Sequence, residues 1–223
     1  RLIESFEDEV MVTYLDFEEI DKIIDKEMPE ERLQIAKDWF LISCFTAQRI
    51  SDLFRMNKKM IVRENGNRFI SMRQFKTGQK VLIPIHFRVE EILNRYDGGF
   101  PPLLSKNEQS NRSLLSQSIK KVVAISGIRE KVRGRYNGKK GIYPKWKLIS
   151  NHTGRRSFAC NFYNEEEWSN ADIMNITGHK TESSFYKYID RNDTTLSHKG
   201  SEMFEKMRLK SLEKKQNENL KVV

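Results

Sequence analysis

The chain reads TGHKTESSFYKYI at residues 177–189, and a second polar stretch, HTGRR, occupies residues 152–156. Two further stretches precede them, TAQRISDL at residues 46–53 and FKTGQK at residues 75–80. Each stretch contains at least one residue type that binds phosphate or transfers protons. Their order and spacing carry more information than any one of these residues alone.

The composition limits the class of protein. The chain has 223 residues with 40 Lys+Arg against 31 Asp+Glu, which gives a net charge of +9. The mean hydropathy of −0.67 predicts a soluble protein, and no apolar run reaches the roughly 18–20 residues of a membrane span. The excess of positive charge favours a polyanionic partner, above all nucleic acid.

The cysteines and the first residue add two expectations. Cys44 and Cys160 are too few for a disulfide framework or a four-ligand zinc site, so we expect a reducing cytoplasm. No secretory leader opens the sequence. The first residue is Arg1 rather than Met, so we expect a fragment of a longer protein.

The apolar pattern predicts a mostly helical domain. Asp16 can cap the helix FEEIDKIID, and a second helix, with Pro29 near its first turn, runs into the apolar segment DWFLISCF. Ser169 with Asp172 indicates a capping box, and Gly178 a helix end. Further helices are expected near residues 89–96, 115–123, 152–163, 170–177 and 181–190.

One small antiparallel sheet of three strands is expected between the helices. Residues 60–62 and 68–72 flank Asn65-Gly66, a strong hairpin signal, and a third strand covers residues 81–85. Pro84 favours an edge position for that strand. The predicted fold class is therefore mainly α with a small three-stranded antiparallel sheet (α+β).

The four stretches together resemble the catalytic domain of the tyrosine recombinases, the integrases of phages and conjugative transposons. The resemblance covers roughly residues 14–190 and rests on an Arg followed by a small residue and an acid, a hairpin Lys, an H-x-x-R motif, and a Gly-His pair nine residues before a Tyr. The matching residues are Arg49, Ser51, Asp52, Lys76, His152, Arg155, His179 and Tyr188. The resemblance implies the tyrosine recombinase catalytic-domain fold.

Two positions depart from the family's pattern. Ala47-Gln48 stands where the family often has Gly-Leu, and Arg156 follows the second Arg where His is sometimes found. We expect neither departure to touch a group that must do chemistry.

The residue types fit cleavage of a phosphodiester without a metal or a cofactor. Arg49 and Arg155 are the residue type that holds non-bridging oxygens with bidentate, permanently charged forks. Tyr188 can form a 3′-phosphotyrosine, which splits one difficult step into two. The resemblance implies His152 as base, Lys76 as general acid and His179 as a donor to the phosphate. Asp52, three residues after Arg49, is expected on the same helix face, where it would orient that arginine or a histidine.

Two of these assignments have close competitors. Tyr186 and Tyr188 point about 200° apart on a helix, and the nine-residue spacing from His179 favours Tyr188. Taken alone, Tyr188 reads as an ordinary core tyrosine. Lys76 lies in Lys-Thr-Gly, which is ordinary turn chemistry, and Lys80 is close by.

Residues 129–147 hold eight Lys/Arg and a single acid, with aromatic residues between them. We favour contact with the DNA backbone over a solvated loop. The candidate DNA contacts are Arg133, Arg135, Lys139, Lys140, Lys145 and Lys147.

Three regions are expected along the chain: a linker or tail at residues 1–13, the catalytic domain at 14–193, and a charged helix or tail at 194–223. Two alternatives remain for residues 194–223: they dock onto a neighbouring copy of the protein, or they form a frayed tail. The resemblance implies an upstream core-binding domain, double-stranded DNA attachment sites, a tetramer of the protein on DNA, and location at the bacterial nucleoid, and leaves room for a host DNA-bending or directionality factor. The alternatives are a type IB topoisomerase-like nicking-closing enzyme and a non-catalytic DNA-binding module.

Overall fold

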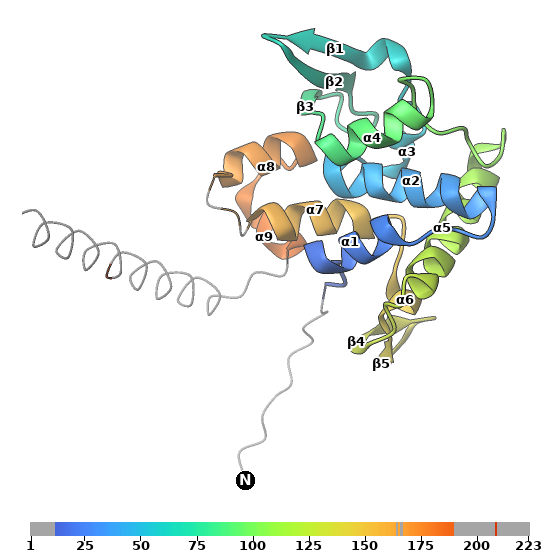
Figure 1. Ribbon diagram of the computed structural model, residues 1–223. Helices are drawn as coiled ribbons and strands as arrows, with labels where there is room; N and C mark the ends of the chain where they lie inside the picture. Colours follow the sequence, from blue (N-terminus) through green and yellow to red (C-terminus); the bar gives the residue numbers. More distant parts are fainter. Residues whose placement is uncertain (1–11, 164, 166, 190–207, 209–223) are drawn as a thin grey trace, which may run out of the picture. The chain divides into compact units, whose positions relative to one another are not determined.

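The computed structural model describes residues 12–163, 165, 167–189 and 208 (Figure 1). The chain divides into two compact units, Arg1–Ile189 and Asp190–Val223, and apart from Arg208 the second unit lies outside the described residues. The expected linker at 1–13 lies almost wholly outside them, and the expected docking tail at 194–223 does so apart from Arg208.

Helices make up most of the described part of the chain. They are α1 (Phe17–Asp25), α2 (Glu31–Thr46), α3 (Ile50–Leu53), α4 (Phe87–Arg95), α5 (Glu108–Ile125), α6 (Lys145–Leu148), α7 (Thr153–Tyr163), α8 (Asn170–Thr177) and α9 (Glu182–Tyr188), with a 3-10 turn at Lys58–Met60. Among the described residues, no helix combines the length and apolar character that a membrane crossing requires.

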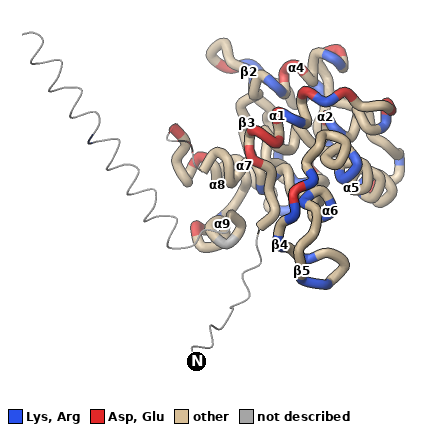
Figure 2. The backbone as a smooth tube through the Cα atoms, turned by 60° about the horizontal axis from the view of Figure 1, so that its bottom comes forward, with Lys and Arg blue, Asp and Glu red and all other residues tan. Residues whose placement is uncertain are grey.

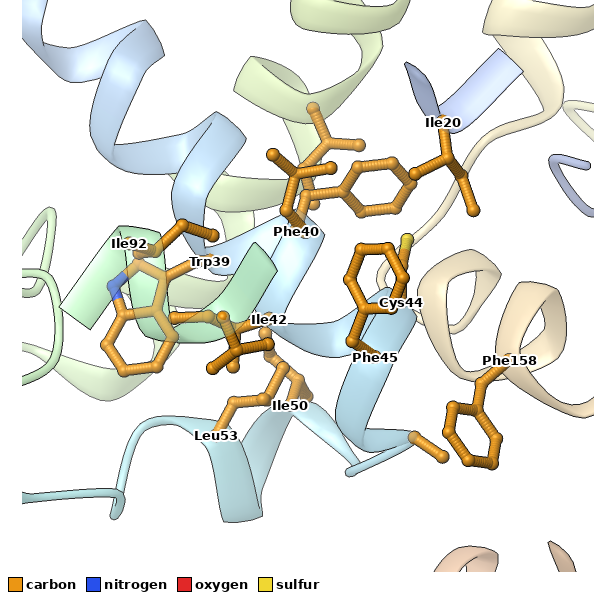
Figure 3. Packing of buried hydrophobic residues seen from close by; sticks show 14 of the residues in the cluster. Ile20, Trp39, Phe40, Ile42, Cys44, Phe45, Ile50, Leu53, Ile92 and Phe158 are labelled. Carbon is orange, nitrogen blue, oxygen red and sulfur yellow. The ribbon is translucent and has the colours of Figure 1, made fainter. Parts of the chain in front are cut away.

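Helix α2 forms the centre of the hydrophobic core. From Ala36 to its end its side chains are buried on every side, and the helix packs against α4, α5 and α7. Figure 3 shows Trp39, Phe40 and Phe45 of this helix among Leu53 and Phe158 of neighbouring elements. The prediction that this apolar segment lies inside the core is confirmed.

The expected three-stranded antiparallel sheet is present, in the order β1 (Ile61–Glu64), β2 (Asn67–Arg73), β3 (Lys80–Pro84). Asn65 and Gly66 both have positive φ, 50° and 81°, as the two-residue hairpin turn requires. Strand β3 lies at an edge of the sheet, as Pro84 indicated. The turn between β2 and β3 carries Lys76.

A second antiparallel sheet was not expected, so the prediction of a single sheet is wrong. Strands β4 (Lys131–Tyr136) and β5 (Lys139–Pro144) pair through a turn at Asn137-Gly138, whose φ values are 48° and 79°. The basic stretch is therefore a β-hairpin rather than a loop. In Figure 1 the two sheets lie at opposite ends of the helical body.

The local signals at the helix ends are mostly confirmed. Asp16 caps α1 in a capping box, Ser169 does the same for α8 with Asp172, and Gly178 ends α8 in the left-handed region at φ 67°. Pro29 is displaced from the expected first turn, because α2 begins only after Glu30, which is its N-cap.

Candidate active site

Five segments deliver the expected site residues. Arg49 is the N-cap of α3, Lys76 lies on the β2–β3 turn, and His152 immediately precedes α7. Arg155 is in the first turn of α7, and Tyr188 ends α9. His179 follows the α8 C-cap, and its backbone N–H donates to Met174 O at 3.0 Å. These segments converge because α7 packs along α2 and α8 packs on α7.

Arg155 is buried, with 2% of its surface exposed, and its Nη1 donates to Ala47 O at 2.8 Å. Its guanidinium carbon lies 5.7 Å from the centroid of the Tyr188 ring. Burial lowers the pKa of Arg155 to about 10, against the opposing effect of Tyr188, so the side chain stays charged at neutral pH. A buried cation is therefore fixed beside the candidate nucleophile.

The Tyr188 hydroxyl is buried and forms no hydrogen bond of ordinary geometry with any described residue, although the Arg155 side chain is near enough to act on it. Burial raises the pKa of Tyr188, while the charges of Arg155 and Arg156 act to lower it. The guanidinium carbon of Arg156 also lies 5.7 Å from the ring centroid. We expected the departure at Arg156 to touch no group that must do chemistry. Instead, Arg156 lies, like Arg155, against the ring of the candidate nucleophile Tyr188.

His179 lies against the same tyrosine, with 4.9 Å between the ring centroids. Burial and the charges of Arg155 and Arg49 lower the pKa of His179 to about 4. Its Nδ1 is 2.8 Å from Thr177 Oγ1, and that hydroxyl donates to Ile173 O at 2.7 Å. When the hydroxyl proton is given to Ile173 O, Nδ1 of His179 is the protonated nitrogen and Nε2 carries the lone pair; in the other tautomer the hydroxyl donates to Nδ1 and Nε2 is protonated.

His152 makes no hydrogen bond to Tyr188 in the described structure. Partial burial and then Arg156, Arg155, Arg49 and Lys76 lower the pKa of His152, so the imidazole is neutral at pH 7. Lys76 itself is exposed on its turn. The same cations thus act on both histidines, and a neutral imidazole at His152 is the form that can accept a proton.

Arg49 and Asp52 have different partners from those expected. Arg49 Nη1 donates to Gln74 Oε1 at 3.3 Å. Asp52 does not orient Arg49: its Oδ1 accepts from the backbone N–H of Phe75 at 2.7 Å and from Arg55 Nη1 at 3.3 Å. The buried carboxylate therefore fixes the start of the turn that carries Lys76.

The two competing tyrosines lie in different surroundings. Tyr186 accepts a hydrogen bond from Asn170 Nδ2 at 3.0 Å, so its hydroxyl is held at the start of α8. Tyr188 instead lies beside Arg155, Arg156 and His179. The geometry favours Tyr188 over Tyr186.

The β4–β5 hairpin exposes most of its basic residues. Arg133 and Arg135 are exposed at alternate positions of β4, and Lys139 and Lys140 are exposed next to the turn. Figure 2 colours the Lys and Arg positions along this hairpin blue. Lys145 is different, because its Nζ lies 2.7 and 2.6 Å from the two carboxylate oxygens of Glu19 and 3.1 Å from Glu130. The ammonium of Lys145 is thus neutralised within the fold and is a poor DNA contact, which corrects that prediction.

Lys147 also makes local contacts. Its ammonium lies 5.8 Å from the centroid of the Tyr136 ring and 5.5 Å from that of Trp146. A lysine over aromatic rings still presents its charge outward, so Lys147 keeps its place among the candidates.

Sequence reasoning missed three residues that contact the site, namely Gln74, Thr177 and Arg156. Arg156 and Thr177 lie inside the quoted stretches, next to Arg155 and Gly178, and only their roles were overlooked. Gln74 carries no local signal, because its partners lie far away in sequence.

The fold is that of the tyrosine recombinase catalytic domains. The structure is similar to XerH site-specific recombinase bound to palindromic difH substrate, with TM-score 0.56 and 20% identity over 85% of this chain and 52% of that one. It is also similar to a lambda integrase dimer bound to a COC′ core site (TM-score 0.56, 20% identity, 82% and 49%) and to residues 82–397 of the Tn1549 transposon integrase with circular intermediate DNA (0.58, 16%, 88% and 66%).

In sequence, the model of the phage integrase family matches residues 13–195, and the chain belongs to that family. No curated protein matches the chain in sequence. The chain spans about half the length of the XerH and lambda integrase chains.

Proposed function

We propose that this chain is the catalytic part of a site-specific DNA recombinase that integrates or excises a mobile element. The observation that carries the proposal is the convergence of Arg155, Arg156 and His179 on the buried ring of Tyr188, whose hydroxyl forms no hydrogen bond of ordinary geometry. Buried polar groups without partners are rare and call for an explanation, and a nucleophile awaiting a phosphate is one.

The proposed reaction is a reversible transfer of the DNA phosphate. The Tyr188 oxygen attacks the scissile phosphorus, the bond to the 5′-oxygen breaks, and a 3′-phosphotyrosine link forms. Arg49 and Arg155 stabilise the charge on the non-bridging oxygens, with His179 as a further donor. His152 takes the phenol proton, and Lys76 gives a proton to the departing 5′-oxygen. Attack by a 5′-hydroxyl from another duplex then reseals the strand.

The proposed partners are double-stranded attachment sites and other copies of the protein. The basic β4–β5 hairpin supports contact with a DNA backbone. The solved structures with this fold include DNA-bound complexes, one of them a lambda integrase tetramer bound to a Holliday junction. We place the protein at the bacterial nucleoid, where a host DNA-bending or directionality factor can join the complex.

Capture of a covalent adduct tests the proposal. The 223-residue chain is incubated with a pool of nicked duplexes of randomised sequence, in which cleavage releases a short fragment and traps the protein on DNA. We expect adducts that survive denaturation from the wild-type protein and from Tyr186→Phe, and none from Tyr188→Phe, which still binds the same duplexes. Adducts from Tyr188→Phe would overturn the assignment, and a wild-type protein that binds without linking would be a DNA-binding module.

A further inference from the structure

A buried pair of glutamines connects three of the catalytic segments. Gln74 precedes the Lys76 turn and Gln48 precedes Arg49, and their exposed fractions are 1% and 0%. Gln74 Nε2 donates to Gln48 Oε1 at 2.9 Å. Polar side chains this deep in a protein are costly unless every group is bonded, so the pattern of bonds shows what they hold.

The hydrogen bonds fix the orientation of both amides. Gln48 Nε2 donates to Thr46 O at 2.7 Å and to Ile176 O at 2.9 Å, and Gln74 Nε2 donates to Ile176 O at 3.3 Å. The Gln74 carbonyl oxygen therefore faces Arg49, whose Nη1 donates to it at 3.3 Å. Turning the Gln74 amide would place its NH₂ group against the Arg49 guanidinium, which has donors only. Turning the Gln48 amide would place its NH₂ group against that of Gln74.

The same residue closes the turn that carries Lys76. Gln74 N–H donates to Gln79 O, and Gly78 N–H donates to Gln74 O, both at 2.9 Å. Thr77 Oγ1 also donates to Gln74 Oε1, at 3.0 Å. One side chain thus accepts hydrogen bonds from Arg49 and from the lysine turn.

The contact with the His179 segment is equally close. A Cβ atom added at Gly178 would lie 2.1 Å from Gln74 Oε1, so only glycine fits between this amide and His179. Ile176, whose carbonyl accepts from both amides, lies in the last turn of α8, two residues before Gly178. Gln48 itself bonds to Thr46, Gln74 and Ile176, none of which is an expected site residue, so any effect of this departure passes through Gln74.

From this geometry we infer that Gln74, locked by Gln48, is a positioning residue that holds together the three segments carrying Arg49, Lys76 and His179, so that these side chains can meet one phosphate. The inference rests on the proposed function and deepens it. Gln74 touches no reacting atom. Its effect is the placement of the general acid and of the phosphate-binding arginine, where a misplacement of about 1 Å can cost about 100-fold in rate.

The test compares Gln74→Met with Gln79→Ala on two duplexes identified by adduct capture. Gln79 is the matched control, because it lies on the same turn and its side chain donates to Asn175 Oδ1, at 3.3 Å on the surface, rather than to an expected site residue. One duplex has the ordinary 5′-oxygen at the scissile phosphate and the other a bridging 5′-sulfur, which leaves without an acid. Thermal unfolding checks that each variant is folded.

We expect Gln74→Met to slow adduct formation on the oxygen duplex by about 10- to 100-fold and to regain at least about tenfold of that loss on the sulfur duplex. Gln79→Ala should match the wild type on both. An equal loss on both duplexes, or no loss, would overturn the inference while wild-type adducts still support the proposed function. If Gln74→Met does not fold, Gln48→Met must show the same selective rescue. An absence of wild-type adducts would overturn the proposed function and the inference with it.

Discussion

The environment of Tyr188 sets two opposing demands on one phenol. Burial raises the pKa of Tyr188, whereas the charges of Arg155 and Arg156 lower it. Because burial has the larger effect, the phenol stays protonated until a base removes its proton. A phosphate between Arg49 and Arg155 would neutralise part of that positive charge. A base is therefore required at the moment of attack, which is the role proposed for His152.

Thr177 determines how His179 meets the phosphate. With Nδ1–H given to Thr177 and a pKa of about 4, His179 is neutral at pH 7 and its Nε2 has no proton to donate. Donation to a phosphate oxygen from Nε2 therefore requires uptake of a proton. Binding to the captured duplex should therefore weaken as the pH rises above the pKa of His179 in the DNA-free protein. The reason is that His179 is protonated in the complex and neutral in the free protein.

We expect calorimetry in buffers of different ionisation enthalpy to show proton uptake when the wild-type protein binds the captured duplex at pH 7. Thr177→Val removes the acceptor of Nδ1–H, so the imidazole can donate from Nε2 while neutral, and the uptake should disappear. Wild-type binding without proton uptake would mean that His179 meets the phosphate as a neutral imidazole, and that Thr177 does not hold it in the Nδ1–H tautomer.

At the scale of single residues, the sequence predicted the motif residues, because their spacing is recognisable. It did not predict the residues that position them, such as Gln74. The intervals between His152 and Arg155 and between His179 and Tyr188 are short and readable. Gln74 bonds to Arg49 across 25 positions and to Ile176 across 102. Such partners become visible only when the chain has folded, because no local pattern encodes them.

At the scale of elements, most of the local signals that were used predicted the structure correctly, Pro29 being the exception. The capping boxes at Asp16 and Ser169 and the Asn65-Gly66 hairpin depend on neighbouring residues, and all three are present. The β4–β5 hairpin was missed although Asn137-Gly138 carries the same signal, because the stretch was interpreted only through its charge, as a contact with DNA. The exposure of β4 alternates residue by residue, as expected for a strand with one open face.

The ion pair between Lys145 and Glu19 makes a prediction about the attachment of this hairpin to α1. Both side chains are nearly buried, with 13% and 8% exposed. Removing one partner of a buried pair costs about 3–5 kcal/mol, and this residual exposure reduces the loss we expect for Lys145→Met to about 2–3 kcal/mol. Urea unfolding measures it.

Lys147→Met is the matched control for that measurement. It loses only contacts of an ammonium with aromatic rings, so we expect it to cost less than about 1 kcal/mol. Equal losses in the two variants would mean that the Glu19 contact does not anchor the hairpin.

For the molecule as a whole, helix α2 links the hydrophobic core to the candidate active site. Helix α2 packs against α4, α5 and α7, and the residues directly after it are Ala47, Gln48 and Arg49. Ala47 O accepts a hydrogen bond from Arg155, which is 108 residues away in sequence. The Gln48 side chain donates one to Ile176 O, which is 128 residues away. The sequence predicted that the motifs meet, but the distances between them follow from the packing of this core.

The distribution of charge predicts how the molecule binds DNA as salt is raised. Arg133, Arg135 and Lys139 are exposed on the β4–β5 hairpin, whereas Lys145 is neutralised within the fold. Each phosphate contact contributes about 0.9 to the slope of log K against log salt. Replacing the three exposed residues with Gln should therefore make the slope shallower by roughly 2.7 if each binds one phosphate.

A second triple variant separates contact from net charge. Lys22→Gln, Lys59→Gln and Arg63→Gln remove the same charge from exposed positions outside the hairpin. Because counterions are released only where a cation meets a phosphate, we expect this variant to change the slope much less. Fluorescence anisotropy on the captured duplex over a range of salt concentrations measures both slopes. Equal slopes for the two variants would mean that the hairpin contributes only general positive charge, and its arginines would then be a solvated face of the strand.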